Sequence, residues 1–381
     1  MADAVRLFIL AGEPSGDRLG ADLVKRLRIK QRATLTGVGG PELEGEGLKS
    51  LFPMSDLSVM GLTDVLKRLP LLLWRARQTT RAILEQKPDI VILIDSQVFS
   101  QTVARQLRKA GYAGRIVLYV APSVWAWKPE RAPVLKPLYD EVLAVLPFEP
   151  AVMRKLGGPS TSYVGHPALE QTTLRASQPA RGPVLLLPGS RTGELRRHLP
   201  LMEQVARELR NHPRVTGFVL PTLRGVEEEV LQTVTTWKTP VFVTTTSEAK
   251  RSAFADSLVA AAVSGTVTLE LALSGVPMAI AYVGDRAQMQ RWRKYKPRFI
   301  GLPNILFGND LVPEFVTSAP QPDPFIDEIE RLLDDEEAVE RQRTGFARVR
   351  AGMEKGAPEA PRTDAADRVL ANLPQRLESG T

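Results

Sequence analysis

Cysteine is absent from the 381 residues of the sequence, which excludes disulfide bonds, thiolate zinc sites and cysteine nucleophiles. The three histidines, His166, His198 and His212, lack the spacing of metal ligands. No Gly-x-Ser-x-Gly elbow is present, which argues against an α/β-hydrolase. We therefore expect a protein that uses no metal and no cofactor, and the lack of cysteine suits a reducing cytosol.

Long apolar runs are also absent. The run Leu69–Trp74 is far shorter than the roughly 20 residues that a membrane-spanning helix needs. Met1–Leu10 moves directly into a strand pattern and lacks the features of a signal peptide. We expect a protein that does not span a membrane. Because basic residues flank Leu69–Trp74, this run is compatible with a bilayer-surface contact and equally with a core helix.

The charge balance leaves several partners open. Lys and Arg number 50 against 43 Asp and Glu, which gives a formal net charge of +7. This charge suits an acidic partner such as nucleic acid, anionic lipid or a phosphorylated substrate, and it also suits an ordinary soluble basic surface. The segment 291–299 interleaves cations with aromatic residues, a pattern typical of phosphate or headgroup contact and also of nucleic-acid binding.

Short apolar runs that fit buried strands alternate with helical patterns along the chain. The expected strands are Val5–Ala11, Ile90–Asp95, Ile116–Ala121, Glu141–Leu146, Val184–Pro188, Val215–Leu220, Val241–Val243, Leu258–Val263 and Met278–Val283. This alternation is the signature of parallel sheets covered by helices on both faces. The length favours two domains.

A polar, proline-punctuated stretch between residues 166 and 183 is interpreted as a hinge. We place the N-terminal domain at 1–170 and the C-terminal domain at 171–355. A terminal helix within about 362–381 is expected to pack back on the N-terminal domain or on a partner chain. Two doubly wound domains facing each other would leave a cleft at the carboxyl ends of their strands, where such sheets bind ligands.

Two motifs in the first half carry candidate chemistry. The turn at residues 11–17, with Gly12, Glu13 and Ser15, follows a strand and precedes a helix, so its amides can approach a ligand. The alternative is a plain turn capped by Ser15 or Asp17. Asp95 ends a buried strand, where a carboxylate can point into the cleft as a base or can simply cap the next helix.

Two further motifs in the second half suit a phosphate ligand. Gly189, Ser190 and Arg191 present amides, a hydroxyl and a guanidinium at the start of a helix, although a capping role is the alternative. The turn Ser264, Gly265 and Thr266 is suited to a diphosphate. Glu270, one turn into the following helix, can accept two ribose hydroxyls or can be an ordinary solvated glutamate.

Taken in order, nine segments resemble those of the lipid-A-disaccharide synthase family. They are AGEPSGD at 11–17, GVGGPELEGEG at 37–47, SVMGLTDVL at 58–66, YVAPSVWAWK at 119–128, LPFEP at 146–150, YVGHP at 163–167, LLPGSR at 186–191, SGTVTLELAL at 264–273 and LPNIL at 302–306. The resemblance covers most of the chain. It implies the GT-B fold, two Rossmann-like α/β domains, and a metal-independent transfer with inversion.

The resemblance also implies substrates and roles. The donor would be UDP-2,3-diacylglucosamine and the acceptor 2,3-diacylglucosamine 1-phosphate (lipid X). Asp95 matches the candidate general base, and Glu13 and Ser15 would line the cleft. The UDP-sugar would be held by Gly189, Ser190, Arg191, Ser264, Gly265, Thr266 and Glu270, while Asn304 matches an activity-linked position.

Because both substrates are amphiphiles, we expect a cytoplasmic protein, peripheral on the anionic inner face of the inner membrane and without a nucleic-acid partner. The expected lipid contacts are Leu69, Leu72, Leu73, Trp74 and Trp292. The oligomeric state stays open, with a homodimer as one option.

One segment departs from the family pattern. Many relatives carry Ile-Asp-x-Pro-Asp/Glu-Phe, whereas here Gln97 replaces the proline and Val98 replaces the second acidic residue. This departure motivates one rival interpretation, an inactive membrane-associated relative. Another is a different GT-B enzyme, such as a UDP-GlcNAc 2-epimerase or a peptidoglycan glycosyltransferase, which would share the role of Glu270 but not the N-terminal motifs.

Overall fold

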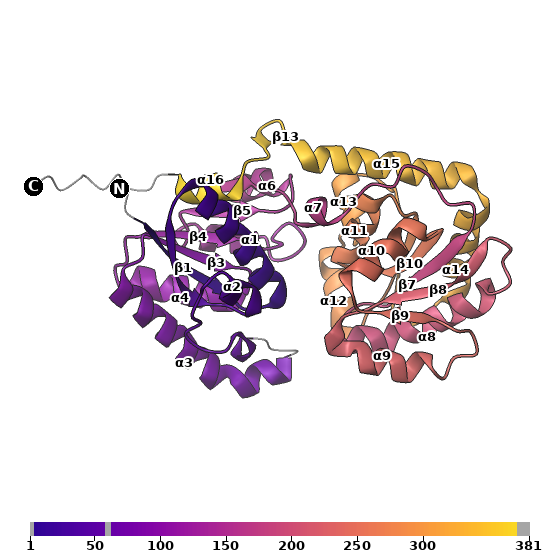
Figure 1. Cartoon of the computed structure of the whole chain (residues 1–381), viewed down its shortest axis with the longest axis horizontal. Coiled ribbons are helices and arrows are strands. Elements are labelled where there is room, and N and C mark those ends of the chain that lie inside the picture. The colour runs from indigo at the N-terminus through magenta and orange to yellow at the C-terminus, as the bar shows by residue number, and fades with distance from the viewer. Residues whose placement is uncertain (1–3, 58–61, 372–381) are drawn as a thin grey trace, which may run out of the picture. The chain divides into compact units, whose positions relative to one another are not determined.

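The computed structural model describes residues 4–57 and 62–371. The chain forms two compact units, each an α/β structure (Figure 1). Unit 1 comprises Met1–Pro167 and Lys355–Thr381, and unit 2 comprises Ala168–Glu354. The chain therefore passes from unit 1 to unit 2 and returns to unit 1 at its end.

Unit 1 is built on a six-stranded parallel sheet in the order β2-β1-β3-β4-β5-β6. The strands are β1 (Val5–Ala11), β2 (Ala33–Val38), β3 (Ile90–Ile94), β4 (Arg115–Tyr119), β5 (Glu141–Ala144) and β6 (Thr161–Tyr163). Its helices are α1 (Pro14–Lys30), α2 (Pro41–Gly45), η1 (Met54–Asp56), α3 (Leu62–Gln86), α4 (Gln97–Lys109), α5 (Arg131–Leu135) and α6 (Glu149–Lys155). The strand β3 is buried at every residue, as expected for a strand covered on both faces.

Unit 2 repeats this architecture with the order β12-β11-β10-β7-β8-β9. The strands are β7 (Gly182–Leu187), β8 (Val215–Pro221), β9 (Phe242–Thr244), β10 (Val259–Val263), β11 (Met278–Val283) and β12 (Glu314–Thr317). The helices are α7 (Ala168–Gln171), α8 (Thr192–Leu209), η2 (Arg224–Val226), α9 (Glu227–Val234), α10 (Ser247–Asp256), α11 (Thr266–Ser274), α12 (Arg286–Tyr295), α13 (Leu302–Phe307), α14 (Pro322–Asp334) and α15 (Glu336–Lys355). Two parallel six-stranded sheets confirm the predicted fold class.

All nine predicted strands are present, with ends that differ by a few residues. To the two six-stranded sheets the structure adds three strands that the sequence pattern did not predict, namely β2, β6 and β12. Their burial explains the omission, because β2 reads as mixed buried and exposed and β12 has only half-buried residues. Edge strands that are not covered on both faces lack the continuous apolar run used for the prediction.

Asp17 has a structural role that the sequence did not reveal. It is 1% exposed, and its carboxylate accepts hydrogen bonds from the backbone N–H groups of Gly40, Glu42 and Leu43 at 2.8, 3.0 and 3.2 Å. These amides open α2, so Asp17 of α1 caps a neighbouring helix. The N-cap of α1 is Glu13, which makes no side-chain capping bond there.

The C-terminal segment returns to unit 1 through a short antiparallel pair, β13 (Gly356–Ala357) and β14 (Ala360–Pro361). It ends in α16 (Ala365–Leu370), which lies against α1 (Figure 1). The Thr363 N–H donates to the carbonyl of Tyr163 at 2.9 Å, which joins the segment to the end of β6. The part of the predicted terminal helix at residues 372–381, like residues 58–61 of the SVMGLTDVL motif, lies outside the described residues.

Glu141 on β5 fastens this segment to the sheet. Its side chain is 3% exposed and accepts hydrogen bonds from Arg115 at 2.5 Å, Ser162 at 2.7 Å and Arg368 of α16 at 2.7 Å. At the exposed end of the interface, the Lys30 ammonium meets Asp367 at 2.7 Å. Removing one partner from a buried ion pair leaves an uncompensated charge and strongly destabilises the fold. Because Arg368 of α16 is one of the two guanidinium partners of Glu141, the terminal helix is part of the fold of unit 1.

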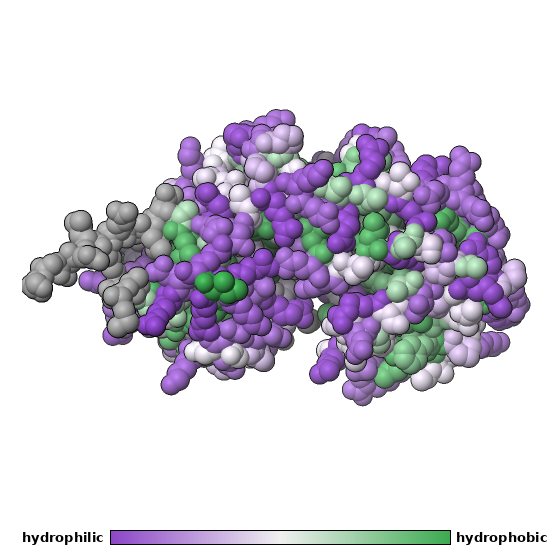
Figure 2. All heavy atoms as spheres, turned by 45° about the horizontal axis from the view of Figure 1, so that its top comes forward, coloured by the Kyte–Doolittle hydropathy of each residue, from purple (hydrophilic) through white to green (hydrophobic). Residues whose placement is uncertain are grey.

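Most of the face drawn in Figure 2 is hydrophilic, and apolar residues reach the surface there in separate patches. Among residues 4–57 and 62–371, no helix combines the length and apolarity needed to cross a membrane.

Removing the Glu141 carboxylate should destabilise unit 1. Glu141→Ala leaves Arg115 and Arg368 without their shared partner, and we expect a loss of about 3–5 kcal/mol in the free energy of unfolding. Hydrogen-exchange mass spectrometry should show faster exchange in peptides from β4, β5 and α16, with unit 2 peptides unchanged. Glu85→Ala is the control, because Glu85 pairs with Arg81 on the exposed face of α3. Equal behaviour of the two variants would contradict this assignment.

Candidate functional site

In each sheet the first strands are added on one side of the initial strand and the later strands on its other side, and we call the place where this change occurs the switch point. In unit 1 it lies between β1 and β3, and in unit 2 it lies between β7 and β10. At such a switch point the two following helices leave on opposite faces, so a crevice opens at the carboxyl ends of the two strands. The segments after β1 and β3 carry Glu13, Ser15 and Asp95, and those after β7 and β10 carry residues 189–191 and 264–266. These residues therefore lie at two switch points, one in each unit.

Asp95 directly follows β3 on a strained stretch of backbone. Asp95 and Ser96 have φ angles of 49° and 41°, which place two consecutive non-glycine residues in the left-handed region. Each such residue costs on the order of 1–3 kcal/mol and persists only where surrounding contacts hold it. The Asp95 N–H donates to the Tyr119 carbonyl at 2.9 Å, and the Ser100 hydroxyl donates to the Asp95 carbonyl at 2.8 Å. Hydrogen bonds therefore hold both the N–H and the carbonyl of Asp95, and its side chain projects from the end of β3.

Burial raises the pKa of the Asp95 carboxyl, although hydrogen bonds from the Gln97 side chain and the Ser96 amide oppose the shift. A raised pKa makes the carboxylate a better proton acceptor than an exposed aspartate. Val98, which replaces the second acidic residue of many relatives, is 77% exposed. Its side chain is therefore on the solvent side of α4, whereas Asp95 is partly buried.

The turn after β1 closely approaches the turn after β3. A Cβ at Gly12 would lie 2.1 Å from the Ser96 hydroxyl oxygen and 3.1 Å from the Ser96 Cβ, so any larger residue there would have to displace Ser96. Glu13 and Ser15 are exposed beside this contact. Glu13 and Ser15, which follow β1, and Asp95, which follows β3, therefore lie at the same edge of the sheet.

Trp125 packs near the carboxyl ends of β4 and β5. Its ring meets Phe148 edge-on at 5.3 Å, and its indole N–H donates to Glu149 at 3.2 Å. Glu149 is 3% exposed and also accepts from the N–H groups of Val145 and Leu146 at 3.2 and 3.0 Å. Burial raises the pKa of Glu149 to about 7 despite these bonds. The sequence pattern did not identify Glu149.

In unit 2, the turn after β10 has the features of an anion site. Gly265 is the N-cap of α11 and provides no side-chain capping bond, so the first amides of the helix are left for another acceptor. The space where a Cβ of Gly265 would lie is open. The Ser264 hydroxyl donates to the Ile300 carbonyl at 2.7 Å, which fixes the turn.

Glu270 lies one turn beyond Thr266 on α11. Because helical side chains lean toward the helix N-terminus, its carboxylate extends toward the same turn. It forms an ion pair with Lys250 of α10, a partner that the sequence did not suggest. Glu270 is therefore a held carboxylate rather than a freely solvated one.

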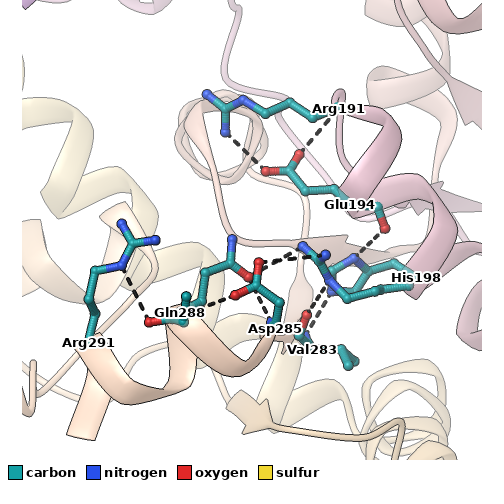
Figure 3. Close-up of polar contacts among 9 residues, drawn as sticks. Arg191, Glu194, His198, Val283, Asp285, Gln288 and Arg291 are labelled. Carbon is teal, nitrogen blue, oxygen red and sulfur yellow. Dashed lines mark hydrogen bonds and ion pairs between the residues drawn. The ribbon is translucent and has the colours of Figure 1, made fainter. Parts of the chain in front are cut away.

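The turn after β7 is organised around Glu194. Gly189 has a φ of 103°, and a Cβ there would lie 2.7 Å from the Glu194 carboxylate. That carboxylate accepts from the N–H groups of Ser190 and Arg191 at 3.1 and 3.3 Å and from the Arg191 guanidinium at 3.0 Å (Figure 3). The N-cap of α8 is Arg191, and Glu194 at position N3 accepts the N-cap amide as the acidic residue of a capping box does. The Arg191 side chain is 78% exposed, which leaves most of its donors available.

His198 connects this turn to β11 (Figure 3). It is fully buried; its Nδ1 lies 2.8 Å from the Glu194 carbonyl and its Nε2 lies 2.8 Å from the Val283 amide nitrogen. Since a backbone N–H only donates, Nε2 must accept and Nδ1 must carry the proton. The last residue pair between β10 and β11 is Val263 with Ala281, so β10 offers no carbonyl to the N–H of Val283. The imidazole of His198 accepts this N–H in its place.

The same stretch anchors the basic helix α12. The Arg197 guanidinium donates to the Val283 carbonyl at 2.8 Å, so adjacent residues of α8 hold both groups of Val283. Asp285 and Gln288 then form a capping box at the start of α12, visible in Figure 3. The orientation of α12 thus depends on the first two turns of α8.

Asn304 is 1% exposed and fully engaged within the protein. Its amide donates to the Val312 carbonyl at 2.7 Å and to Glu314 at 2.8 Å, and its oxygen accepts from the N–H groups of Leu311 and Val312. Glu314 also accepts from Ile300 N–H at 2.8 Å. The Ile300 carbonyl in turn accepts from the Ser264 hydroxyl. Asn304 is therefore connected to the turn at residues 264–266 through a chain of hydrogen bonds, and its own polar atoms are all used within the protein.

The predicted lipid contacts are divided between the two units. In unit 1, Leu69, Leu73 and Trp74 are 43%, 43% and 53% exposed on α3, while Leu72 packs partly against the core. In unit 2, Trp292 of α12 is 37% exposed and borders a hollow of about 470 Å³ that also includes Phe299, Arg298 and Arg341.

Within the part of the chain that the structure describes, no group of three histidine, aspartate or glutamate side chains is placed to hold a metal ion. Positive charge near the turns after β7 and β10 comes from side chains such as Arg191 and from helix N-termini.

The comparison with known families gives one consistent result. The model of the lipid-A-disaccharide synthetase family matches residues 7–366. A lipid-A-disaccharide synthase of Rhodopseudomonas palustris is 40% identical over 380 residues, covering 97% of this chain and 96% of the relative. Another, from Ruegeria pomeroyi, is 42% identical over 340 residues and covers 84% of each chain.

Solved structures share the fold at low sequence identity. A glycosyltransferase of kitacinnamycin has a TM-score of 0.61 at 16% identity, covering 97% of this chain and all of that one. The calicheamicin glycosyltransferase CalG4 has a TM-score of 0.56 at 20% sequence identity, covering 97% of this chain and 98% of that one. A UDP-GlcNAc 2-epimerase from Neisseria meningitidis has a TM-score of 0.58 at 12% sequence identity, covering 91% of this chain and 97% of that one. These likenesses confirm the GT-B architecture, and the choice among its enzymes rests on the family match.

Replacing His198 should weaken unit 2. His198→Phe removes the acceptor of the buried Val283 N–H, and we expect a loss of about 1–3 kcal/mol in the free energy of unfolding. Burial lowers the pKa of His198 below its ordinary 6.5. The stabilisation is therefore complete above pH 6.5 and is lost as the pH falls through the folded-state value. Hydrogen exchange of β11 and α8 peptides between pH 7.5 and 5 should show this loss once corrected for intrinsic exchange rates.

In His198→Phe the pH-dependent part of that exchange should be smaller than in the parent protein. Peptides of unit 1 in the same samples serve as the internal control. An unchanged pH dependence in the variant would mean that His198 does not carry this effect.

Proposed function

The chain belongs to the lipid-A-disaccharide synthase family and has its glycosyltransferase activity, and we propose that the two switch points divide the reaction between them. The proposed donor is UDP-2,3-diacylglucosamine, and the proposed acceptor is 2,3-diacylglucosamine 1-phosphate. The products are lipid A disaccharide 1-phosphate and UDP. Unit 2 binds the UDP part of the donor, and unit 1 supplies the base for the acceptor.

The observation that carries this division is the position of Asp95. A partly buried carboxylate with a raised pKa lies on a strained turn at the switch point of unit 1. Strain and perturbed pKa values concentrate at functional sites because the surrounding structure must hold them in place. The corresponding place in unit 2 has exposed helix amides and Arg191, which suit a diphosphate and not an acceptor hydroxyl.

The proposed transfer is a single displacement. The 6-hydroxyl oxygen of the acceptor attacks the anomeric carbon of the donor as Asp95 takes the hydroxyl proton. The bond between that carbon and the UDP oxygen breaks on the opposite side, so configuration at the carbon is inverted. UDP leaves with the electron pair of that bond.

Charge that develops on the leaving diphosphate must be met by the protein. Arg191 has a mostly exposed guanidinium steadied by Glu194, and the first amides of α11 are uncapped. Donors that are already in place stabilise the transition state without reorganisation. We assign Glu270 to the ribose hydroxyls, Thr266 and Gly265 to the diphosphate, and Ser264 and Asn304 to shaping the turn. Gly189 and Ser190 shape the turn that presents Arg191.

Glu13 and Ser15 are proposed to contact the acceptor, because they are exposed at the same sheet edge as Asp95. Both substrates are amphiphiles, so we further propose that the protein works at the cytoplasmic face of the inner membrane. Leu69, Leu73 and Trp74 form the apolar part of this contact. Trp292, among the exposed cations of α12, is proposed to meet anionic headgroups.

Asp95→Asn tests the base. The amide is nearly isosteric but cannot take the proton, so we expect kcat to fall by about 10²–10⁴-fold while the Kd for UDP stays unchanged. In the parent protein, activity should rise with pH through the raised pKa of Asp95, because only the ionised carboxylate accepts a proton. Asp22→Asn, an exposed aspartate on α1, is the matched control. An Asp95→Asn variant with near-normal kcat would contradict the assignment.

The apolar contact is tested by changing Leu69, Leu73 and Trp74 to serine together. Loss of this surface should reduce co-sedimentation with vesicles of phosphatidylglycerol and phosphatidylcholine by at least about tenfold, given the area removed. UDP binding, which is assigned to unit 2, should be unchanged. Ile29→Ser, at a residue 85% exposed on α1, is the control. Undiminished co-sedimentation of the triple variant would rule this contact out.

A further inference from the structure

Lys250 lies next to the proposed ribose-binding glutamate but belongs to a different helix. It is the fourth residue of α10, which runs from Ser247 to Asp256 and contacts α11. Its ammonium forms an ion pair with the Oε2 atom of Glu270. The two side chains are 34% and 22% exposed, so the pair is partly shielded but open on one side.

A second contact restricts the ammonium. The Lys250 nitrogen lies 5.5 Å from the centre of the Phe254 ring, one turn along α10, within the range of a cation–π contact. Phe254 is itself 4% exposed and therefore fixed by packing. The lysine is thus held between a ring on its own helix and a carboxylate on the next.

The helix does not depend on this ion pair for its own structure. Thr246 caps α10 by accepting from the Ala249 N–H at 3.2 Å, and the buried side chains of Ala253 and Phe254 attach the helix to unit 2. Lys250 is the fourth of ten residues in α10, and Glu270 is the fifth of nine in α11, one turn beyond the turn assigned to the diphosphate. The position of the ion pair is therefore better suited to orienting a ligand group than to supporting the fold.

We infer that Lys250 is a positioning residue that sets the Glu270 carboxylate for the vicinal hydroxyls of the ribose. The inference rests on the proposed UDP site. An ionised carboxylate has about four positions for hydrogen-bond donors, and one ammonium occupies one of them. Among the described residues, Oε1 has no other partner and remains for the ribose.

This role makes Lys250 part of the discrimination between ribose and deoxyribose. A carboxylate fixed by Lys250 gains a charged hydrogen bond from the 2′-hydroxyl, whereas 2′-deoxy-UDP cannot form it. Without the lysine, the carboxylate is free to rotate away or to be solvated. The gain from the hydroxyl is then lost, while contacts to the base and diphosphate persist.

The test is calorimetric binding of UDP and 2′-deoxy-UDP to the full-length protein and its Lys250→Met variant. Charged hydrogen bonds are worth about one to two powers of ten in affinity, so the parent should prefer UDP by about tenfold or more. Lys250→Met should weaken UDP binding by about five- to tenfold and leave 2′-deoxy-UDP binding nearly unchanged. The preference should then approach that of Glu270→Ala.

Two further variants make the result specific. Lys250→Arg keeps the charge and should restore most of the preference, whereas Lys238→Met, at an exposed lysine of unit 2, should not alter it. Equal weakening of both nucleotides in Lys250→Met would assign the lysine to the diphosphate instead and overturn the inference, as would no change in either. Failure of the parent protein to bind UDP at all would instead refute the proposed nucleotide site.

Discussion

The arrangement of functional groups depends on one constraint, the parallel pairing of strands around a point where their order reverses. In each unit the first strand is flanked by the second strand on one side and a later strand on the other, β3 in unit 1 and β10 in unit 2. The connecting helices must then leave on opposite faces, because crossovers between parallel strands are right-handed. Backbone amides and strand-end side chains are consequently uncovered at that edge.

The two switch points are chemically different, because the turn after β3 partly buries a carboxylate whereas the turn after β10 leaves backbone amides open. After β3, a carboxylate is held on left-handed backbone and partly desolvated, which raises its pKa. After β10, a glycine N-cap leaves helix amides open and positive. One edge therefore favours taking a proton, and the other favours holding an anion. A sugar transfer from a nucleotide donor requires both properties.

Much of this could be predicted from the sequence because strand ends and turns are local. Continuous apolar runs identify β3 and β10, and the residues directly after them identify Asp95 and the turn at 264–266. The partners that complete the site could not be predicted, because they come from distant segments. Lys250 reaches Glu270 from another helix, and His198 serves as the acceptor of a strand amide 85 residues away. An exposed lysine and a mid-helix histidine have no pattern that reveals such contacts.

Asn304 shows what the tertiary structure adds to a role suggested by a motif. Its position matched an activity-linked residue, yet its amide is fully used by the loop at 311–314. Burial and partner geometry, which only the fold provides, distinguish a residue that faces a ligand from one that shapes the turn around it. In physical terms the sequence predicts where the chain ends a strand, and the tertiary structure determines which groups remain free there.

The most direct test of the account is to incubate the pure protein, in the presence of a metal chelator, with UDP-2,3-diacylglucosamine and radiolabelled 2,3-diacylglucosamine 1-phosphate. The account predicts one labelled disaccharide for each UDP released, joined through the 6-oxygen of the acceptor and inverted at the transferred anomeric carbon. UDP release without disaccharide, or retention of configuration, would contradict it.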